Sequence, residues 1–370
     1  MKKTLLATAI AGAVVASGAQ AATVYDQDGT KLDIYGRIAL GIQGGGDKYV
    51  TGNDGTPETN ARGQKLKANG TEFVDVFSRV GLRGSQRVTS DLTAFGNFEV
   101  RPQFDEVNRD GQQVRNSYLG LRSDTFGTVQ AGNFDSFYLE AVSAPFDVYI
   151  DRGLEFTDGS HRARGDSLGY ISPNLSGFQV YLMGKHYTGN AGVSDGDEES
   201  SGSRFNTAGG AVYETGGLRL ALGYAEDKDD YKIVQKDGPG FDEIIYGGTA
   251  AYAFNDAFSA RLGYEQQKDN RDVVGVGMTY GISDWAFHLD YYHVSLDGKS
   301  RDAARANDSS TSRDAWAAGA YYNIASNFDI FAEVHEADQG SVTLFGSDTS
   351  DDLRNTRDSV YWLTGARYHF

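Results

Sequence analysis

Apolar and polar side chains alternate along most of this chain, which is the spacing of a β-strand rather than of a helix. In the stretch 92–101, Leu92 and Phe98 fall on one side of the strand, whereas Asn97 and Glu99 fall on the other. Stretches of the same kind recur at 74–83, 218–224, 258–265, 328–335 and 357–370. Because roughly sixteen such stretches are present, an even number, the pattern predicts an all-β antiparallel fold of 16 strands.

The connectors between these stretches differ in length in a regular way. Short turns are expected near 89–90, 123–124, 174–175, 215–216, 255–256, 283–284 and 326–327. Most connectors between them are longer, polar and rich in Gly, Asp and Ser, as at 44–70, 133–162, 188–203, 228–240, 297–312 and 339–356. Short turns at one rim and long loops at the other are typical of a transmembrane β-barrel, with short periplasmic turns and long extracellular loops.

A secreted antiparallel sandwich or jelly roll also alternates, and it is the main competing fold. Such a fold does not need the rhythm of short and long connectors. A soluble barrel places its apolar face inside, but the polar face here carries many Arg, Asp and Glu residues, which cannot fill a dry core. We therefore expect the apolar face to meet lipid and the polar face to line a wet lumen. The 42 Tyr and Phe residues suit interfacial girdles, and five prolines suit long paired strands.

The N-terminal residues predict an export signal. Lys2 and Lys3 precede an apolar core at 5–15, and Ala19-Gln20-Ala21 has the small-x-small cleavage pattern. We expect a cleaved signal peptide at 1–21 and one barrel domain at 22–370. The formal net charge of −17 then becomes −19, because two lysines are lost, which argues against a nucleic-acid partner. The chain has no cysteine, so disulfides are not expected to stabilise it.

Three segments carry a resemblance to a known family. They are 28–37 (DGTKLDIYGR), 78–84 (SRVGLRG) and 365–370 (GARYHF). In this order they resemble the first strand, the second strand and the closing strand of the general porins of the Gram-negative outer membrane. The resemblance implies a homotrimer of sixteen-stranded barrels in contact with outer-membrane lipid and lipopolysaccharide, and passive diffusion of ions and small hydrophilic solutes. It also implies that Tyr368 and Phe370 form the assembly signal.

The connector 133–162 differs from the other long loops because it is rich in apolar and aromatic residues, so we expect it to pack against the inner wall rather than extend into water. Its acids Asp147, Asp151, Glu155 and Asp158 would then line the opening. The stretch 149–156 (YIDRGLEF) resembles the eyelet loop of the family, in which two acids four residues apart face the pore. This resemblance assigns the pore-facing role to Asp151 and Glu155; the alternative is that they are ordinary solvated loop acids.

The family places basic residues opposite this loop, and the matching positions here are Arg37, Arg79 and Arg115. Alternation supports Arg37 and Arg79, whereas Arg115 shares its parity with the apolar Leu119 and Leu121. A fourth family position falls on Ala163, with Arg162 and Arg164 on either side, and the sequence does not decide between these two. Arg83 and Arg101 are further candidates for the lumen. The acidic total favours cations and the arginine cluster favours anions, so the preference stays open.

The sequence shows no nucleophile elbow, phosphate-binding loop, dinucleotide fingerprint or zinc-protease motif, so an enzyme, a metal site or a cofactor is not expected. His288 and His293 are five residues apart on opposite strand faces, which suits metal binding poorly. Asp290, His293 and Ser295 are too close on one strand for a catalytic triad. A substrate-specific channel, a barrel enzyme, or an adhesin or phage receptor that uses the exposed loops remain the alternatives.

Overall fold

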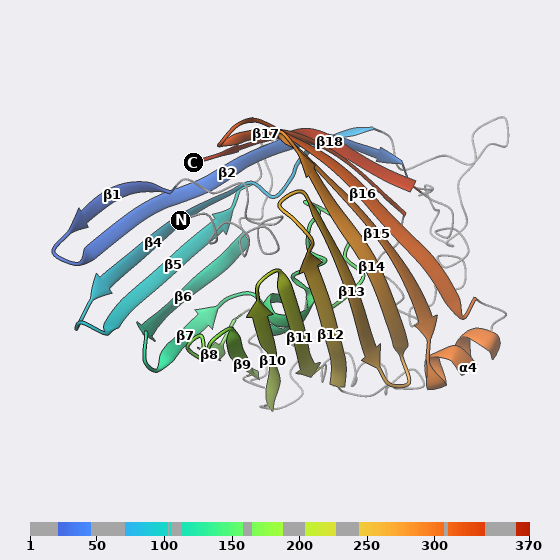
Figure 1. Cartoon of the computed structure of the whole chain (residues 1–370), viewed down its shortest axis with the longest axis horizontal. Coiled ribbons are helices and arrows are strands. Elements are labelled where there is room, and N and C mark those ends of the chain that lie inside the picture. Colours follow the sequence, from blue (N-terminus) through green and yellow to red (C-terminus); the bar gives the residue numbers. More distant parts are fainter. Residues whose placement is uncertain are drawn as a thin grey trace, which may run out of the picture.

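The computed structural model describes most of the chain as one continuous β-sheet wrapped around a central space (Figure 1). The proposed signal peptide lies outside the described residues except for Ala21. The described residues are 21–45, 71–102, 104, 113–157, 165–187, 204–226, 244–306, 310–336 and 360–370.

Eighteen β-segments make up the sheet, and each pairs antiparallel with its neighbours. They are β1 Ala22–Gln27, β2 Thr30–Gly45, β3 Glu72–Asp75, β4 Arg79–Arg87, β5 Leu92–Arg101, β6 Gln113–Ser123, β7 Gly127–Asn133, β8 Ser167–Ile171, β9 Phe178–Tyr187, β10 Arg204–Thr215, β11 Leu218–Glu226, β12 Ile244–Ala253, β13 Phe258–Gln267, β14 Arg271–Ile282, β15 Trp285–Leu296, β16 Ser312–Ala325, β17 Phe328–Glu336 and β18 Val360–His369.

Two barrel strands consist of two segments each, which reconciles eighteen segments with sixteen strands. On one edge of β2, β18 pairs down to His369 opposite Arg37, and β1 continues from Ala22 opposite Ile34. On the other edge, β3 and β4 follow one another across an interruption at 76–78. The pairing of β18 with β2 closes the sheet, so the prediction of a closed, sixteen-stranded antiparallel barrel is confirmed.

The two faces of the wall have the chemistry that the alternation predicts. Apolar side chains on the outer face are exposed in the isolated chain, as for Leu222 (71%) on β11 and Leu119 (69%) on β6. Inward positions on the same strands carry small residues such as Gly120 or polar residues such as Arg219. Only a barrel surrounded by lipid makes this arrangement stable, because burying ion pairs and exposing apolar side chains would be unfavourable in water.

The connectors at the rim opposite the short turns, here called the far rim, vary in length. The link between β13 and β14 is only residues 268–270, whereas the link between β15 and β16 holds the helix α4, Gly298–Ala306. The third far-rim loop joins β7 to β8 and holds a short π-helix, η1, Leu139–Ser143. Within the described residues, no helix has the length and apolar character needed to cross a bilayer. The described part of the third loop packs on the lumenal side of the wall.

Candidate functional site at the third loop

The third loop, residues 134–166, is described at 134–157 and 165–166, and the stretch 134–157 lies against the inner wall of the barrel. Its aromatic side chains are buried, with Phe137, Tyr138 and Phe146 fully so. The first half of the loop packs on β9 to β12 in one apolar cluster, and the second half packs on β14 to β16 in another. The apolar composition of this loop is therefore explained by burial inside the barrel, where its rings contact the wall.

Glycines of the wall make room for these rings. A Cβ at Gly263 of β13 would lie 2.7 Å from the Phe156 ring, and one at Gly275 of β14 would lie 2.8 Å from it. At Gly247 of β12, the space that a Cβ would take is occupied by the Tyr138 hydroxyl and ring. The missing side chains on the lumenal face let the loop approach the strand backbone closely.

A single wall carboxylate joins the two arms of the loop. Glu265 of β13 accepts a hydrogen bond from the Tyr138 hydroxyl at 2.8 Å. It also accepts from the Thr157 backbone N–H at 2.9 Å and from the Thr157 hydroxyl at 2.8 Å. Arg271 of β14 lies 3.6 Å away and completes the charge balance. Glu265 thus fixes both the beginning and the end of the inserted segment.

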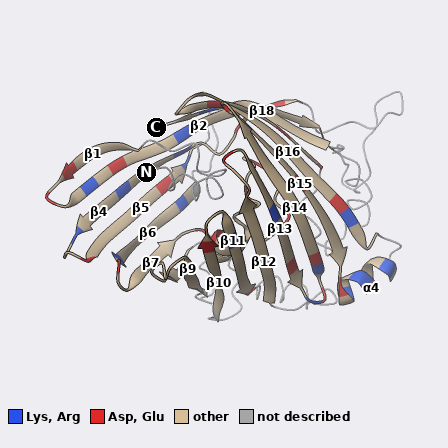
Figure 2. Ribbon diagram, in the orientation of Figure 1, with Lys and Arg blue, Asp and Glu red and all other residues tan. Residues whose placement is uncertain are grey.

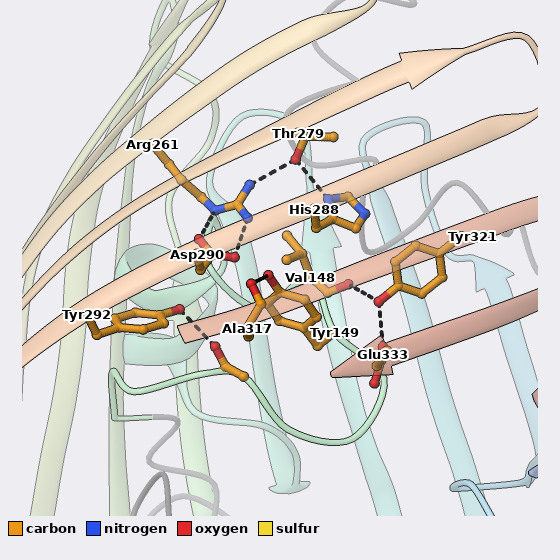
Figure 3. Close-up of polar contacts among 11 residues, drawn as sticks. Val148, Tyr149, Arg261, Thr279, His288, Asp290, Tyr292, Ala317, Tyr321 and Glu333 are labelled. Atoms are coloured by element: carbon orange, nitrogen blue, oxygen red, sulfur yellow. Dashed lines mark hydrogen bonds and ion pairs between the residues drawn. The ribbon is translucent and has the colours of Figure 1, made fainter. Parts of the chain in front are cut away.

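The bend of the loop is held by strands β15 to β17 (Figure 3). The Tyr149 hydroxyl donates to the carbonyl of Ala317 at 2.8 Å, and the Tyr292 hydroxyl donates to the carbonyl of Gly153 at 2.9 Å. The backbone N–H of Ile150 donates to Glu333 at 2.7 Å. Together these bonds hold residues 149–153 against the wall.

The same region of the wall carries a buried charge network (Figure 3). Arg261 of β13 donates to both carboxylate oxygens of Asp290 of β15, at 2.8 and 2.5 Å. It also donates to the Thr279 hydroxyl at 2.9 Å, which in turn lies 2.9 Å from His288 Nδ1. Asp290 is therefore bound to Arg261. His293 contacts a different carboxylate, that of Asp314.

Asp151 of the third loop is partly open, with its side chain 21% exposed. The Arg152 Nε lies 3.3 Å from its carboxylate, and the Arg152 guanidinium sits over the ring of Tyr361 of β18 at 4.6 Å. Burial raises the pKa of Asp151, and the adjacent Arg152 opposes that rise only in part. Asp147 is half-buried.

Glu155 lies in a different place from Asp151. Its side chain is fully buried and its two oxygens accept from Arg313 of β16 at 3.1 and 2.5 Å. This position beneath the loop does not suit the pore-facing role that the resemblance implies for it. Residues 158–164, which include Asp158, Arg162 and Arg164, lie outside the described part of the chain.

Opposite the loop, β2 to β6 carry the predicted arginines. Arg37 and Arg79 are direct cross-strand partners on β2 and β4. Arg115 of β6 pairs with Glu99 at 3.0 Å and with Asp135 of the third loop at 2.9 Å, and Arg79 lies 4.0 Å from the same Glu99. Basic residues band these strands in Figure 2. Two like charges directly opposite each other destabilise a sheet, so their presence favours a role in function.

The interruption between β3 and β4 positions Arg37. Phe77 has a positive φ of 57°, which turns its carbonyl toward β2, where it accepts from Arg37 Nε at 3.0 Å. The ring of Phe77 lies under the Arg101 guanidinium at 4.7 Å. The interruption itself is held by Ser78, whose hydroxyl accepts from the Ala39 N–H at 2.9 Å. An irregular piece of backbone thus brings Arg37 and Arg101 to one spot.

A β-bulge explains how Arg115 reaches the lumen despite its parity. Glu99 of β5 pairs with Asn116 of β6, but the next residue, Val100, pairs with Val114, so Arg115 is the extra residue. Val114 and Leu119 both face outward, and the bulge between them shifts the alternation by one residue. The sequence alone gave a conflicting parity here because a bulge leaves no clear mark in the pattern.

Sequence reasoning missed the wall residues that hold the loop. Glu265, Arg313 and Glu333 are all inward positions on strands that were correctly identified, so the alternation itself was an available signal. What the sequence did not show is that they bond to the third loop rather than face water. At the barrel's closing strand, the Phe370 N–H and C=O pair with Gly36 at 3.1 and 2.8 Å, and the Phe370 ring stacks on Tyr368.

Comparisons with known proteins agree with this geometry. A family model described as Gram-negative porin matches residues 7–368. A monosaccharide porin of Halomonas is 33% identical over 318 residues, covering 80% of this chain and 81% of that protein. The outer membrane porin F of Salmonella typhimurium is 25% identical over 276 residues, covering 71% of this chain and 69% of that protein.

Solved structures show the same fold. The structure of the Salmonella typhi OmpF complex with daunomycin superposes with a TM-score of 0.66 at 17% identity, covering 94% of this chain and all of that one. An anion-selective porin from Comamonas acidovorans superposes with a TM-score of 0.62 at 15% identity, covering 92% of this chain and all of that one. At these identities the likeness establishes the shared barrel.

Proposed function

The chain belongs to the Gram-negative porin family, and we propose that the constriction of its channel lies between Asp147 and Asp151 of the third loop and Arg37, Arg79 and Arg115 of the wall. As a porin the protein is a passive diffusion channel of the outer membrane and not an enzyme. The placement of the constriction is supported by one observation above the others, which is that the apolar third loop packs inside the barrel opposite paired arginines.

Opposed charges give the constriction its selectivity. Acids on one side and arginines on the other set up a transverse field across a narrow opening. A polar solute with a dipole keeps favourable interactions as it passes, whereas an apolar solute displaces oriented water and gains nothing. We expect ions and small hydrophilic solutes to pass, and the monosaccharide porin among the relatives makes monosaccharides the first neutral solutes to try.

We propose a role for Glu155 that differs from the one the resemblance implies. With its carboxylate fully buried against Arg313, it acts as an anchor of the loop, and Asp151 four residues earlier is the acid that meets the pore. Arg162 and Arg164 remain candidates for the basic side of the constriction. We also propose a cleaved signal peptide at 1–21, a homotrimer in contact with lipopolysaccharide, and an assembly role for Tyr368 and Phe370.

Single-channel recording under a salt gradient tests the constriction. Asp147→Asn/Asp151→Asn is expected to move the reversal potential toward anions, and Arg37→Gln/Arg79→Gln toward cations, because each removes charge from one side. Asp256→Asn, in the short β12–β13 turn, is the matched control and is expected to leave the reversal potential unchanged. Conducting channels with no shift in either double variant would remove this constriction assignment while keeping the porin.

A further inference from the structure

Three places on the inner wall repeat one arrangement of a glycine, an arginine and an aromatic ring. In each, a Gly-x-Arg segment lies on one strand and the ring on the neighbouring strand is the direct cross-strand partner of the glycine. The three sets are Gly81, Arg83 and Tyr35; Gly120, Arg122 and Phe95; and Gly365, Arg367 and Phe331.

The ring of each set lies between the glycine and the arginine. A Cβ at Gly120 would lie 2.5 Å from the Phe95 ring, and one at Gly365 would lie 2.9 Å from the Phe331 ring. The arginine two residues on sits over the ring, at 4.5 Å for Arg83, 5.8 Å for Arg122 and 5.6 Å for Arg367. A guanidinium that stacks on a ring keeps its N–H groups available for an acceptor.

The set on β17 and β18 shows what that acceptor is. Arg367 donates from Nε and Nη2 to one carboxylate oxygen of Asp329, at 3.0 and 2.8 Å, while resting over Phe331. Asp329 is itself buried, so the wall provides an oxyanion for this arginine. The other two sets have the same ring and glycine, and the question is what fills the place of Asp329 in them.

Among the described residues, neither of the other two arginines forms an ion pair with a carboxylate. Asp33 faces Arg83 across the strands, but its oxygens are engaged by Lys31 at 3.0 Å and by the Thr23 hydroxyl at 2.8 Å. Within the described part of the chain, Arg83 makes no side-chain hydrogen bond or ion pair; its guanidinium lies over the Tyr35 ring and is attracted to Asp33 only at longer range.

Arg122 is in a similar position near the turn rim. The nearby Asp91 accepts from the Ser123 hydroxyl at 2.6 Å and from the Asp124 N–H at 3.1 Å. The cross-strand partners of Arg122 are Thr93 and Thr128, which are neutral. Among the residues that the structure describes, Arg122 contacts the Phe95 ring but no carboxylate. Both guanidinium groups are therefore positioned by a ring, and their N–H donors face the lumen.

The register on β5 places these two arginines below the constriction. Glu99, which binds Arg115, marks the constriction; Asn97 pairs with Arg83 and Thr93 pairs with Arg122. At roughly 3.3 Å per residue along a strand, Arg83 lies about 7 Å and Arg122 about 20 Å from the level of Glu99. Both steps lead toward the short turns, which is the periplasmic side.

We propose that Arg83 and Arg122, here called the lower arginine pair, form two successive binding positions for small oxyanions on the periplasmic side of the constriction. Each guanidinium binds a carboxylate, phosphate or sulfate group with two of its N–H donors, as Arg367 donates twice to one oxygen of Asp329. The ring and the glycine beneath hold the guanidinium flat against the wall, so it stays in the solute's path without blocking it. These positions are separate from the constriction, whose charged groups the experiment below leaves intact.

Sulfate is a suitable probe in planar bilayers that contain the whole protein. Sulfate added to each side in turn is expected to lower the chloride current of the wild-type channel in a saturable manner. In Arg83→Gln/Arg122→Gln the concentration for half of that effect is expected to rise roughly tenfold, because a charge-assisted hydrogen bond is lost at each position. The same variant is expected to move the reversal potential toward cations.

Two further variants separate a built site from bulk charge. Arg87→Gln removes an arginine from the turn end of the same strand β4, where no ring contacts it within the described residues, and is expected to keep the wild-type sulfate response. Phe95→Leu keeps the charge of Arg122 but removes its ring, and is expected to weaken sulfate binding. Conductance confirms that each variant is folded. A wild-type response in the double variant, or an equal loss in Arg87→Gln, would overturn the proposal.

Discussion

Glu155 of the third loop and Arg313 of β16 form a bidentate ion pair, in which two guanidinium nitrogens lie 2.5 and 3.1 Å from the two carboxylate oxygens. The carboxylate is completely buried, and 158 residues separate the two partners in sequence. Breaking a buried pair by removing one partner leaves an uncompensated charge. Glu155→Gln is therefore expected to lower the free energy of unfolding by about 3–5 kcal/mol and to increase the noise of the open channel as the loop loosens.

The double variant Glu155→Gln/Arg313→Gln separates this pair from other effects. Since it leaves no buried charge behind, we expect it to recover much of the lost stability, and a double-mutant cycle measured by urea unfolding in detergent gives the coupling free energy. Additive losses in the two single variants would show that the ion pair does not hold the loop.

The buried environment of Asp151 predicts a pH dependence of selectivity. Burial raises its pKa above the ordinary value of 3.8, with Arg152 opposing the rise, and Glu333 accepts a hydrogen bond from the backbone immediately before it. The folded protein thus holds the Asp151 proton more tightly than the unfolded chain, so acidification through the raised pKa removes an unfavourable charge and slightly stabilises the fold.

The measurable result is in the reversal potential. As pH falls, the reversal potential of the wild-type channel is expected to move toward anions with a midpoint above pH 3.8, and Asp151→Asn is expected to lack that step. The comparison between the two proteins at each pH removes the contribution of lipid headgroups and other acids. A step that persists unchanged in Asp151→Asn would assign the titration to another group.

The barrel could be predicted from the sequence because alternation is a local property that each strand displays by itself. Leu119 and Leu121 face outward as their pattern requires. The conflict at Arg115 arose because the bulge is set by the neighbouring β5, and a strand does not record its partner's register. The same limit explains why β1 and β18 were not recognised as two pieces of one barrel strand.

The site was predictable only in part, and Glu155 shows why. The spacing of Asp151 and Glu155 is visible in the sequence, but which acid meets water depends on Arg313, a residue far along the chain. Loop packing joins groups that are distant in sequence, so one-dimensional patterns carry little information about it. Strand parity alone predicts the inward direction of Arg37 and Arg79, because a regular strand alternates its two faces, whereas at Arg115 the bulge breaks that rule.

Gly247 provides a test of how the first arm of the loop is seated. The Tyr138 hydroxyl and ring occupy the space where a Cβ would be, and that hydroxyl binds Glu265 at 2.8 Å. Gly247→Ala is expected to displace Tyr138, to lower the free energy of unfolding by about 1–3 kcal/mol and to change the single-channel conductance. Gly84→Ala on β4, where nothing lies within 4 Å of the new methyl, is the matched control.

The cross-strand pair of Arg37 and Arg79 predicts that removing one arginine makes the barrel more stable and also changes its ion selectivity. Like charges directly opposite each other on a sheet are destabilising. Of the two arginines, Arg79 alone has an acid within 4.0 Å among the described residues, and it shares this acid, Glu99, with the closer Arg115. Arg79→Gln is therefore expected to raise the free energy of unfolding by about 0.2–1 kcal/mol while it moves the reversal potential toward cations.

Arg115→Gln is the informative comparison for this prediction. Arg115 has two carboxylate partners, Glu99 and Asp135, so its loss leaves acids without a counter-charge and is expected to lower stability. Both variants remove one positive charge from the proposed constriction, so both are expected to shift selectivity in the same direction. If Arg79→Gln destabilised the barrel as much as Arg115→Gln does, the arginine pair would be a structural element rather than a strained one kept for permeation.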